Sequence, residues 1–411
     1  MRTTFGILCM GVLMQLLAAP AVAQELPPRI GGNPVVLSAE DALREGAPLS
    51  ATDHAFRLSR IELSLDQDGN GQWRPEQSDD WRFRGTGGEV LIELFPGEIL
   101  WMRGTGIEDA EEASSWIGEV LLPEPGVAII TRSKEGVYGT FDVGNRRYAL
   151  ASGTGQGRQG FVKQVDSRDI GICLTGSVHG DHAHHKHYHH PAQVPTWASK
   201  AVAQKSGGGS STVDILFLYT SGALSYMGGD PSAFINNLVA SLNAAFSASE
   251  VTGSVRAVYY GIQTGVDSPD DMDDFFNLRN KMQAGTSPFS SLASLRNAHA
   301  ADIMVLLVDR ALTSGPNWPY WPICGVAGNT GGTPLYQPHI SGGSSDDLAY
   351  AVVAVNCADN DRTFHHEVGH LIGGWHDESF DEGRSDQALP LRVHIPSGAR
   401  LKQSFAILLN P

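Results

Sequence analysis

The pattern of apolar residues changes at a glycine- and serine-rich stretch, Ser206–Ser211. Between about residues 51 and 165, short apolar or alternating runs are separated by turn residues, which predicts antiparallel strands. After residue 212, short apolar runs alternate with segments of helical spacing, which predicts an α/β domain. A chain of 411 residues is also long for a single core. We therefore expect two domains, of which the first is β-rich and sandwich-like.

The N-terminus has the features of a secretory signal peptide. Arg2 precedes an apolar run, and Ala21-Val22-Ala23 is a small-x-small cleavage site. The run is too short for a membrane anchor, and no stop-transfer pattern follows it, so we predict a secreted protein. The predicted ranges are a signal peptide (1–23), a β-rich domain (24–178), a His-rich and Gly/Ser-rich linker (179–212) and an α/β domain (213–411).

Charge and cysteine content limit the partners of the chain. The net charge of −16 argues against nucleic-acid and anionic-membrane binding, because both need a basic face. No stretch after the signal peptide is apolar and long enough to span a bilayer. Cys9 leaves with the signal peptide, and an odd number of cysteines remains, namely Cys173, Cys324 and Cys357. At least one thiol therefore has no partner within the mature chain.

The stretch "RTFHHEVGHLIGGWHDESF", residues 362–380, carries the chemistry. His366 and His370 lie four residues apart, so on a helix both imidazoles can reach one metal ion, and Glu367 lies beside that ion as a catalytic base. Gly373 allows the helix to end and turn, which brings His376 to the same ion. Three imidazoles leave a fourth tetrahedral position open, which is typical of a catalytic Zn²⁺ rather than a structural one.

His365 precedes the first candidate ligand. It projects about 100° away from His366 on a helix, so we expect it to pack or to orient a ligand.

The segment "HEVGHLIGGWHD", His366–Asp377, resembles the metzincin zinc peptidases, and Asp377 resembles the adamalysin/reprolysin branch. The resemblance extends through "VDILFLYTSGA", "ADIMVLLVD", "CGVAG" and "AYAVVAVNCADNDRTFHHEVGH". It implies an α/β metzincin-like catalytic domain that cleaves proteins or peptides, in which Asp377 has a structural hydrogen-bonding role. It also implies that "CGVAG" is the sheet edge to which an extended substrate adds.

The first domain resembles the propeptides of bacterial reprolysin-like peptidases in "SWIGEVLLPEPGVAIITRSKEGVYGTFDVGNRRYAL". This resemblance implies a β-rich propeptide domain and a proenzyme. In many metzincin precursors a propeptide cysteine binds the zinc, a role open to Cys173, which could equally be an ordinary buried or intermolecular cysteine. Cys324 and Cys357 look like the local disulfide of the family, and two buried free thiols are the alternative.

The C-terminal tail departs from the family. Metzincins carry a methionine-containing turn after the third histidine, whereas the last methionine here is Met304 and 34 residues follow Asp377. We expect a truncated or altered C-terminal subdomain, through either a frameshift in the coding DNA or a genuinely shortened domain. The sequence therefore predicts a secreted zinc-dependent endopeptidase made as a proenzyme. The alternatives are a catalytically inactive secreted metal-binding protein derived from such a peptidase, and a β-rich binding module with a decayed peptidase attached.

Two further motifs have two interpretations each. Seven of the 15 histidines lie between His179 and His190, in either a metal-collecting tract or a solvated linker. The stretch "DQDGNGQWRPE", Asp66–Glu76, has the acidic spacing of a calcium loop, but a turn between two strands explains it as well.

Overall fold

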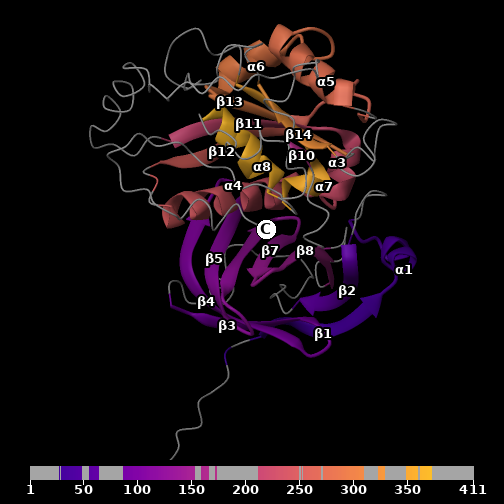
Figure 1. Ribbon diagram of the computed structural model, residues 1–411, viewed down its shortest axis with the longest axis vertical. Helices are drawn as coiled ribbons and strands as arrows, with labels where there is room; N and C mark the ends of the chain where they lie inside the picture. The colour runs from indigo at the N-terminus through magenta and orange to yellow at the C-terminus, as the bar shows by residue number, and fades with distance from the viewer. Residues whose placement is uncertain are drawn as a thin grey trace, which may run out of the picture.

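The computed structural model contains a β-barrel and a helix-flanked sheet, with one long helix between them (Figure 1). The structure describes residues 27, 29–48, 55–63, 87–152, 159–165, 172–173, 212–249, 251, 253–269, 272–309, 323–328, 349–359 and 362–372. The predicted signal peptide, the calcium-like loop, the histidine tract and all residues after Ile372, including Gly373, His376 and Asp377, lie outside this part. The predictions for these segments, and the four domain ranges, stay predictions.

Nine strands close into the barrel in the order β1-β2-β9-β8-β7-β6-β5-β4-β3. Strand β1 closes it, because it pairs antiparallel with β2 and parallel with β3. The strands are β1 (Arg29–Leu37), β2 (Ala55–Leu63), β3 (Glu89–Phe95), β4 (Glu98–Asp109), β5 (Ala113–Leu122), β6 (Gly126–Ser133), β7 (Val137–Val143), β8 (Arg146–Ser152) and β9 (Gln159–Val165).

The sandwich-like first domain expected from the sequence is wrong, because these strands form one closed barrel. Closure leaves no edge strand exposed. Closure of the barrel depends on β1, which lies before residue 51, where the predicted strands begin. This strand contains Gly31, Gly32 and Pro34. Glycine and proline disfavour strands, so the local sequence of β1 gives little indication of its pairing.

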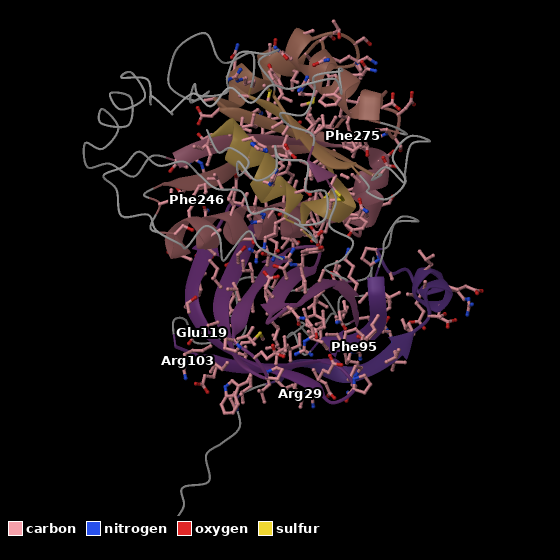
Figure 2. All side chains as sticks on the ribbon, in the orientation of Figure 1. Arg29, Phe95, Arg103, Glu119, Phe246 and Phe275 are labelled. Atoms are coloured by element: carbon pink, nitrogen blue, oxygen red, sulfur yellow. A yellow bond between two sulfur atoms is a disulfide. The ribbon has the colours of Figure 1, made fainter. Side chains whose placement is uncertain are left out.

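The barrel has its own apolar core. Large aromatic side chains, Phe95, Trp116, Phe141 and Tyr148, are almost fully buried in it. Figure 2 labels Phe95, together with Arg103 and Glu119, whose ion pair lies on the exposed surface of β4 and β5. This core contains barrel residues alone, so the barrel has the packing of an independent domain.

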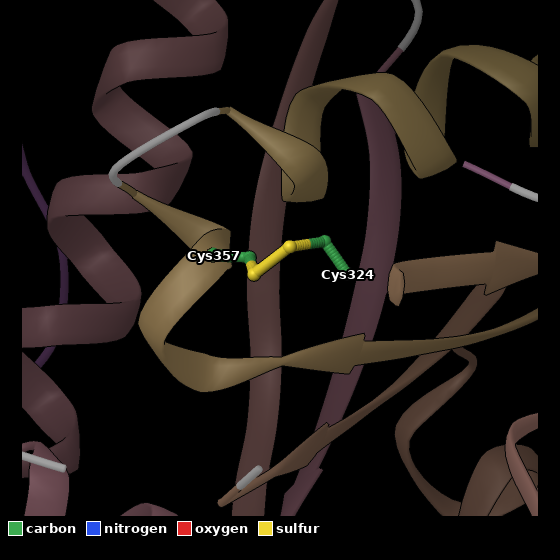
Figure 3. Close-up of a disulfide and its surroundings, with 2 residues drawn as sticks. All are labelled: Cys324 and Cys357. Atoms are coloured by element: carbon green, nitrogen blue, oxygen red, sulfur yellow. A yellow bond between two sulfur atoms is a disulfide. The ribbon is translucent and has the colours of Figure 1, made fainter. Parts of the chain in front are cut away.

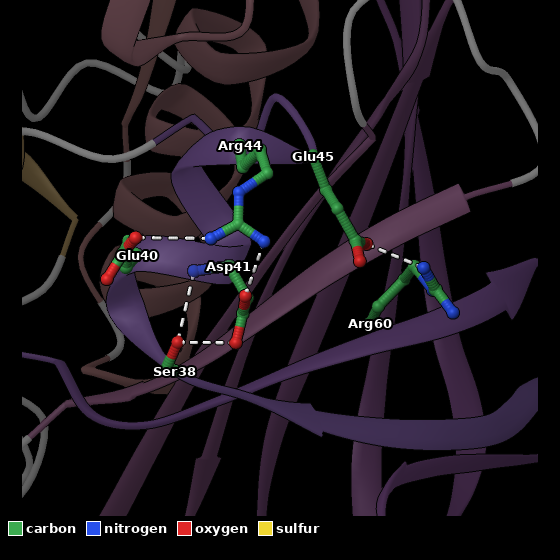
Figure 4. A network of polar contacts seen from close by, with 6 residues as sticks. All are labelled: Ser38, Glu40, Asp41, Arg44, Glu45 and Arg60. Atoms are coloured by element: carbon green, nitrogen blue, oxygen red, sulfur yellow. Dashed lines mark hydrogen bonds and ion pairs between the residues drawn. The ribbon is translucent and has the colours of Figure 1, made fainter.

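A short helix, α1 (Ala39–Arg44), packs against β2. Its first turn is capped by Ser38, whose Oγ accepts a hydrogen bond from the backbone N–H of Asp41 at 3.0 Å. Ion pairs join Arg44 to Glu40 and Asp41, and Arg60 to Glu45 (Figure 4). The Arg44 pairs are exposed and contribute little to stability.

The second sheet has six strands in the order β10-β14-β15-β13-β11-β12. Strands β11, β12, β13 and β15 are parallel, whereas β14 runs antiparallel to β15, and β10 pairs parallel with β14. Their bounds are β10 (Ile172–Cys173), β11 (Thr212–Tyr219), β12 (Ser254–Ile262), β13 (Ile303–Val308), β14 (Ile323–Ala327) and β15 (Tyr350–Ala354). The apolar patterns predicted β11, β12, β13 and β15, and the family resemblance implied β14. Strand β10, which follows the barrel strands in the chain but joins this sheet, was not predicted.

Helices cover both faces of this sheet. Apolar side chains of α4 (Pro231–Ala248) and α8 (Thr363–Leu371) share one core with β11 and β13, and those of α5 (Met272–Ala284) and α6 (Leu292–His299) share another. Phe246 and Phe275, labelled in Figure 2, belong to these two cores.

Asp230 caps α4 by accepting from the N–H of Ala233 at 3.2 Å, which confirms the predicted Asp-Pro helix start. Two short helices, α3 (Ser221–Tyr226) and α7 (Val355–Ala358), follow β11 and β15.

Helix α4 lies between the sheet and strands β5, β6 and β7 of the barrel (Figure 1). The barrel therefore packs on the helical face that also carries α8. None of the helices within the described ranges has both the length and the apolar character needed to cross a membrane.

Candidate active site

Helix α8 positions the residues singled out from the motif. Phe364, Val368 and Leu371 recur at helical spacing and are fully buried against the sheet. This apolar stripe fixes the rotation of α8 about its axis, so that His366 and His370 share a different face. The helix begins after Arg362, whose φ of 60° is left-handed and whose side chain forms no cap hydrogen bond. Its start is therefore held by other parts of the chain.

His366 and His370 form a close pair on α8. Their Nε2 atoms lie 3.0 Å apart, with the ring planes at 87°. Two nitrogen ligands on a tetrahedral zinc ion lie about 3.3 Å apart, given Zn–N bonds of about 2.0 to 2.1 Å, so this pair fits zinc closely. His376, the third predicted ligand, lies outside the described residues, and within them no group of three potential ligands forms a metal site. The structure thus brings together two of the three predicted ligands.

Glu367 is fully buried beside the edge region of the sheet. A Cβ atom on Gly325 of β14 would lie 2.8 Å from Cγ and Oε1 of Glu367, and 2.6 Å from Cγ2 of Thr363. No side chain fits at residue 325 without moving Glu367. The carboxylate of the predicted base therefore lies directly under the strand to which a substrate is expected to add.

His365 packs away from this pair, as predicted. It is buried, and its Nε2 lies 3.0 Å from Oγ of Ser241 on α4. Burial, reinforced by the positive charges of Arg362 and Arg147, lowers the pKa of His365 to about 3, so the ring stays neutral at physiological pH. Its part is to join α8 to α4 rather than to bind metal.

The Cys324–Cys357 disulfide implied by the family resemblance is present (Figure 3). It joins β14 to α7, and Cys324 is adjacent to Gly325 in the chain. The disulfide therefore fixes the strand that covers Glu367.

Replacing both cysteines by serine is expected to lower the free energy of unfolding by about 2 to 4 kcal/mol, because the bond closes a loop across 33 residues of sequence. Urea unfolding of the variant and of the parent protein, with and without dithiothreitol, measures this. The reduced parent should match the variant. Equal stability of the oxidised and reduced parent would contradict the prediction.

Strand β10 lies on the outer side of β14. The register pairs Ile172 with Ile323 and Cys173 with Gly325, and β10 also lies close to α8. The backbone of Cys173 is therefore next to the glycine that covers Glu367. In the described part of the chain, β14 is thus paired on both sides.

Comparison with known proteins identifies the second half of the chain. Residues 209–396 match a reprolysin model described as "Metallo-peptidase family M12". The second half of the chain is therefore similar to the reprolysin-like metallopeptidases, and its described part, within residues 212–372, is called the metallopeptidase domain below.

Two relatives from Stenotrophomonas maltophilia, strains R551-3 and K279a, are both named "Peptidyl-Asp metalloendopeptidase". They are 27% and 25% identical to this chain over 77% and 71% of its length, which covers 72% and 66% of their own. Metalloproteinase-II from Bacteroides fragilis matches with a TM-score of 0.39 and 11% identity, over 72% of this chain and 84% of that one.

A charged cluster lies where the barrel meets the metallopeptidase domain. Asp142 of β7 pairs with Arg147 of β8 at 2.5 Å and with Arg362 at the start of α8. Burial alone would raise the pKa of Asp142, but the two guanidinium groups outweigh it and hold the pKa well below its usual range. Burial lowers the pKa of Arg362, and Asp142 opposes this shift. Asp142 is therefore ionised at neutral pH while the barrel is docked on α8.

Substituting Asp142 by asparagine is expected to lower the free energy of unfolding by about 1.5 to 3 kcal/mol at neutral pH, the usual range for a hydrogen-bonded charge. Because the folded-state pKa lies below the unfolded one, this contribution is complete above about pH 5 and decreases below about pH 4. Urea unfolding of both proteins from pH 8 to pH 3 measures the difference. A difference that already decreases between pH 8 and pH 6 would contradict it.

Several residues near the site were not found by sequence reasoning. The sequence places Gly325 in the "CGVAG" strand and Asp142 in a predicted strand of the first domain, but it indicates no role for either residue at the site. Arg279 of α5 donates from Nη1 to the carbonyl oxygen of Ala327 on β14 at 3.0 Å. Burial lowers the pKa of Arg279, and the charge of Glu367 opposes this shift, so the two groups lie within electrostatic reach. No local pattern distinguishes these residues, because their partners lie far away in the sequence.

Proposed function

We propose that the chain is a secreted, zinc-dependent endopeptidase that is made as a proenzyme. The observation that carries this proposal is the pair of imidazoles on α8, with their Nε2 atoms 3.0 Å apart, next to the fully buried Glu367. The M12 family match over residues 209–396 supports it.

His366 and His370 would hold the metal, with His376 as the third ligand expected from the sequence. Two neutral imidazoles this close can share only one electrophile between their Nε2 atoms, either a proton or a metal ion. A zinc ion bound there would polarise the scissile carbonyl and increase the acidity of water.

Glu367 would carry the proton. On a helix, Glu367 projects about 60° away from His370, so its carboxylate lies beside the face that carries the imidazoles. It would accept a proton from the attacking water and later donate one to the leaving amine. A substrate in extended conformation would pair by main-chain hydrogen bonds along β14, directly above this carboxylate. Because Gly325 has no side chain, there is space at this position for the substrate backbone and for the carboxylate of Glu367.

The pairing of β10 with β14 supports the proenzyme proposal. A substrate that adds to the outer edge of β14 requires the position that β10 has in this chain. The register of Cys173 opposite Gly325 is consistent with a propeptide cysteine near the metal site. Removal of the segment that contains β10 would open the edge. The features of the N-terminus and the Cys324–Cys357 disulfide support export to an oxidising compartment.

The relatives also suggest a preference among substrates. They are named as peptidyl-Asp metalloendopeptidases, and we propose the same preference for aspartyl residues at the cleaved bond here. Mass spectrometry of the peptides released from casein would show it as an excess of fragment ends next to aspartate.

The decisive experiment measures zinc content and casein cleavage of the processed chain, with and without chelator, beside a Glu367→Ala control and a deletion of residues 179–190. We expect one zinc per chain in the parent and in both variants. The parent and the deletion variant should cleave casein, and chelator should stop this cleavage, whereas Glu367→Ala should not cleave casein at all. Zinc binding without cleavage would favour the inactive metal-binding protein. Zinc that disappears with residues 179–190 would assign metal binding to the histidine tract instead of α8.

A further inference from the structure

Hydrogen bonds join the barrel to the metallopeptidase domain, across a surface that also includes the apolar side chains of Tyr138, Ala149 and Ala151. Asn237 of α4 is fully buried and donates from Nδ2 to the carbonyl oxygen of Ile129 at 3.2 Å and to Oγ1 of Thr131 at 3.1 Å. Other hydrogen bonds across this surface join Ser133 to Asp230, Lys163 to Tyr226, Glu108 to Asn243 and Glu112 to Tyr260. Such polarity is typical of surfaces that associate after folding, rather than of a continuous core.

One aromatic residue anchors this surface. The ring of Tyr138 on β7 packs edge-on against Phe234 of α4, with the ring centroids 4.8 Å apart, and lies in the apolar core of the metallopeptidase domain. Its hydroxyl donates to Asp359. A buried aromatic side chain surrounded by polar contacts is the usual arrangement of an energetic hot spot between two proteins.

Two of the contacts reach the residues that lead into α8. Tyr138 contacts Asp359 and Asp142 contacts Arg362, so one barrel strand holds both ends of this four-residue segment. Arg362 has a left-handed φ of 60°, which a non-glycine residue adopts only when its surroundings hold it there. The N–H of His366 donates to the carbonyl oxygen of Arg362 at 3.0 Å. The first turn of the helix that carries the candidate ligands thus depends on a residue that the barrel holds.

We infer that the barrel is a separable ligand of the metallopeptidase domain, anchored by Tyr138 and Asp142, which keeps the start of α8 in its present conformation after the linker is cut. The inference rests on the proposed function, because it describes how the proenzyme is held together. Cutting the linker does not release the barrel, and activation requires a second step that separates Asp142 from Arg362.

The test uses the full chain with Glu367→Gln, to prevent self-cleavage, and a site for a sequence-specific protease placed between residues 179 and 211. After cleavage, size-exclusion chromatography and calorimetry measure whether the two fragments stay together. We expect co-elution, and an increase in Kd of at least about tenfold in Asp142→Asn, because Arg362 loses the carboxylate that pairs with it across the surface. Glu119→Gln is the matched control, since it also removes a carboxylate that pairs with an arginine, but on the exposed barrel surface.

Two further measurements separate anchoring from misfolding. In a double-mutant cycle, Asp142→Asn and Arg362→Gln should each weaken binding, and the double variant should weaken it little further. In the uncut chain, amide hydrogen exchange of residues 362–366 should be faster in Asp142→Asn than in Glu119→Gln. Fragments that separate in the parent chain, or equal Kd values for the two carboxylate variants, would overturn the inference. None of these readouts needs catalysis, so an inactive enzyme would refute the proposed function without affecting this test.

Discussion

Glu367→Gln is expected to reduce kcat for peptide hydrolysis by about 10²- to 10⁴-fold, the usual contribution of a positioned general base. Glutamine keeps the size of the side chain, which matters because Glu367 is fully buried against β14. It cannot accept the proton of the attacking water. Steady-state cleavage of a fluorogenic peptide by the processed chain measures the loss.

The control for this prediction is the metal content. His366 and His370 are unchanged in Glu367→Gln, so the zinc stoichiometry should equal that of the parent. The Glu119→Gln variant alters an exposed carboxylate of the barrel and controls for processing, because the processed enzyme that it yields should have the activity of the parent. If Glu367→Gln loses zinc together with activity, the role of Glu367 is to hold the site rather than to move a proton.

Gly325→Ala is expected to lower kcat/KM by about a hundredfold, because a displacement of about 1 Å in a catalytic group has an effect of this size. The added Cβ would lie 2.8 Å from Cγ and Oε1 of Glu367, closer than such atoms approach. The carboxylate must therefore move away from the strand on which the substrate is expected to lie. Cleavage kinetics of the processed variant measure the effect.

A double variant, Gly325→Ala with Thr363→Ser, removes the second contact, in which Cγ2 of Thr363 would lie 2.6 Å from the new Cβ. If displacement of Glu367 causes the loss, the double variant keeps the lowered kcat/KM of Gly325→Ala. Restored activity in the double variant would instead assign the effect to Thr363.

The sequence predicted the local structure of the α/β half well. Buried parallel strands such as Ile303–Val308 are continuous apolar runs, and the start of α4 has a capping aspartate followed by proline. The His-Glu-x-x-His spacing, together with helical periodicity, was sufficient to place His366 and His370 on one face and Glu367 beside them. These predictions depend only on residues within one or two helical turns of each other.

The sequence by itself determined the chemistry of the motif and the class of each half of the chain. Only the tertiary structure decided how the barrel closes, that β10 joins the other sheet, and that Gly325 lies over Glu367. It also placed Tyr138 and Asp142 against the start of α8, more than 200 residues away in sequence. Hydrophobic period and capping residues report on neighbours along the chain. Pairing between distant segments depends instead on register, on the shape of side chains and on which charges meet, none of which leaves a periodic trace in the sequence.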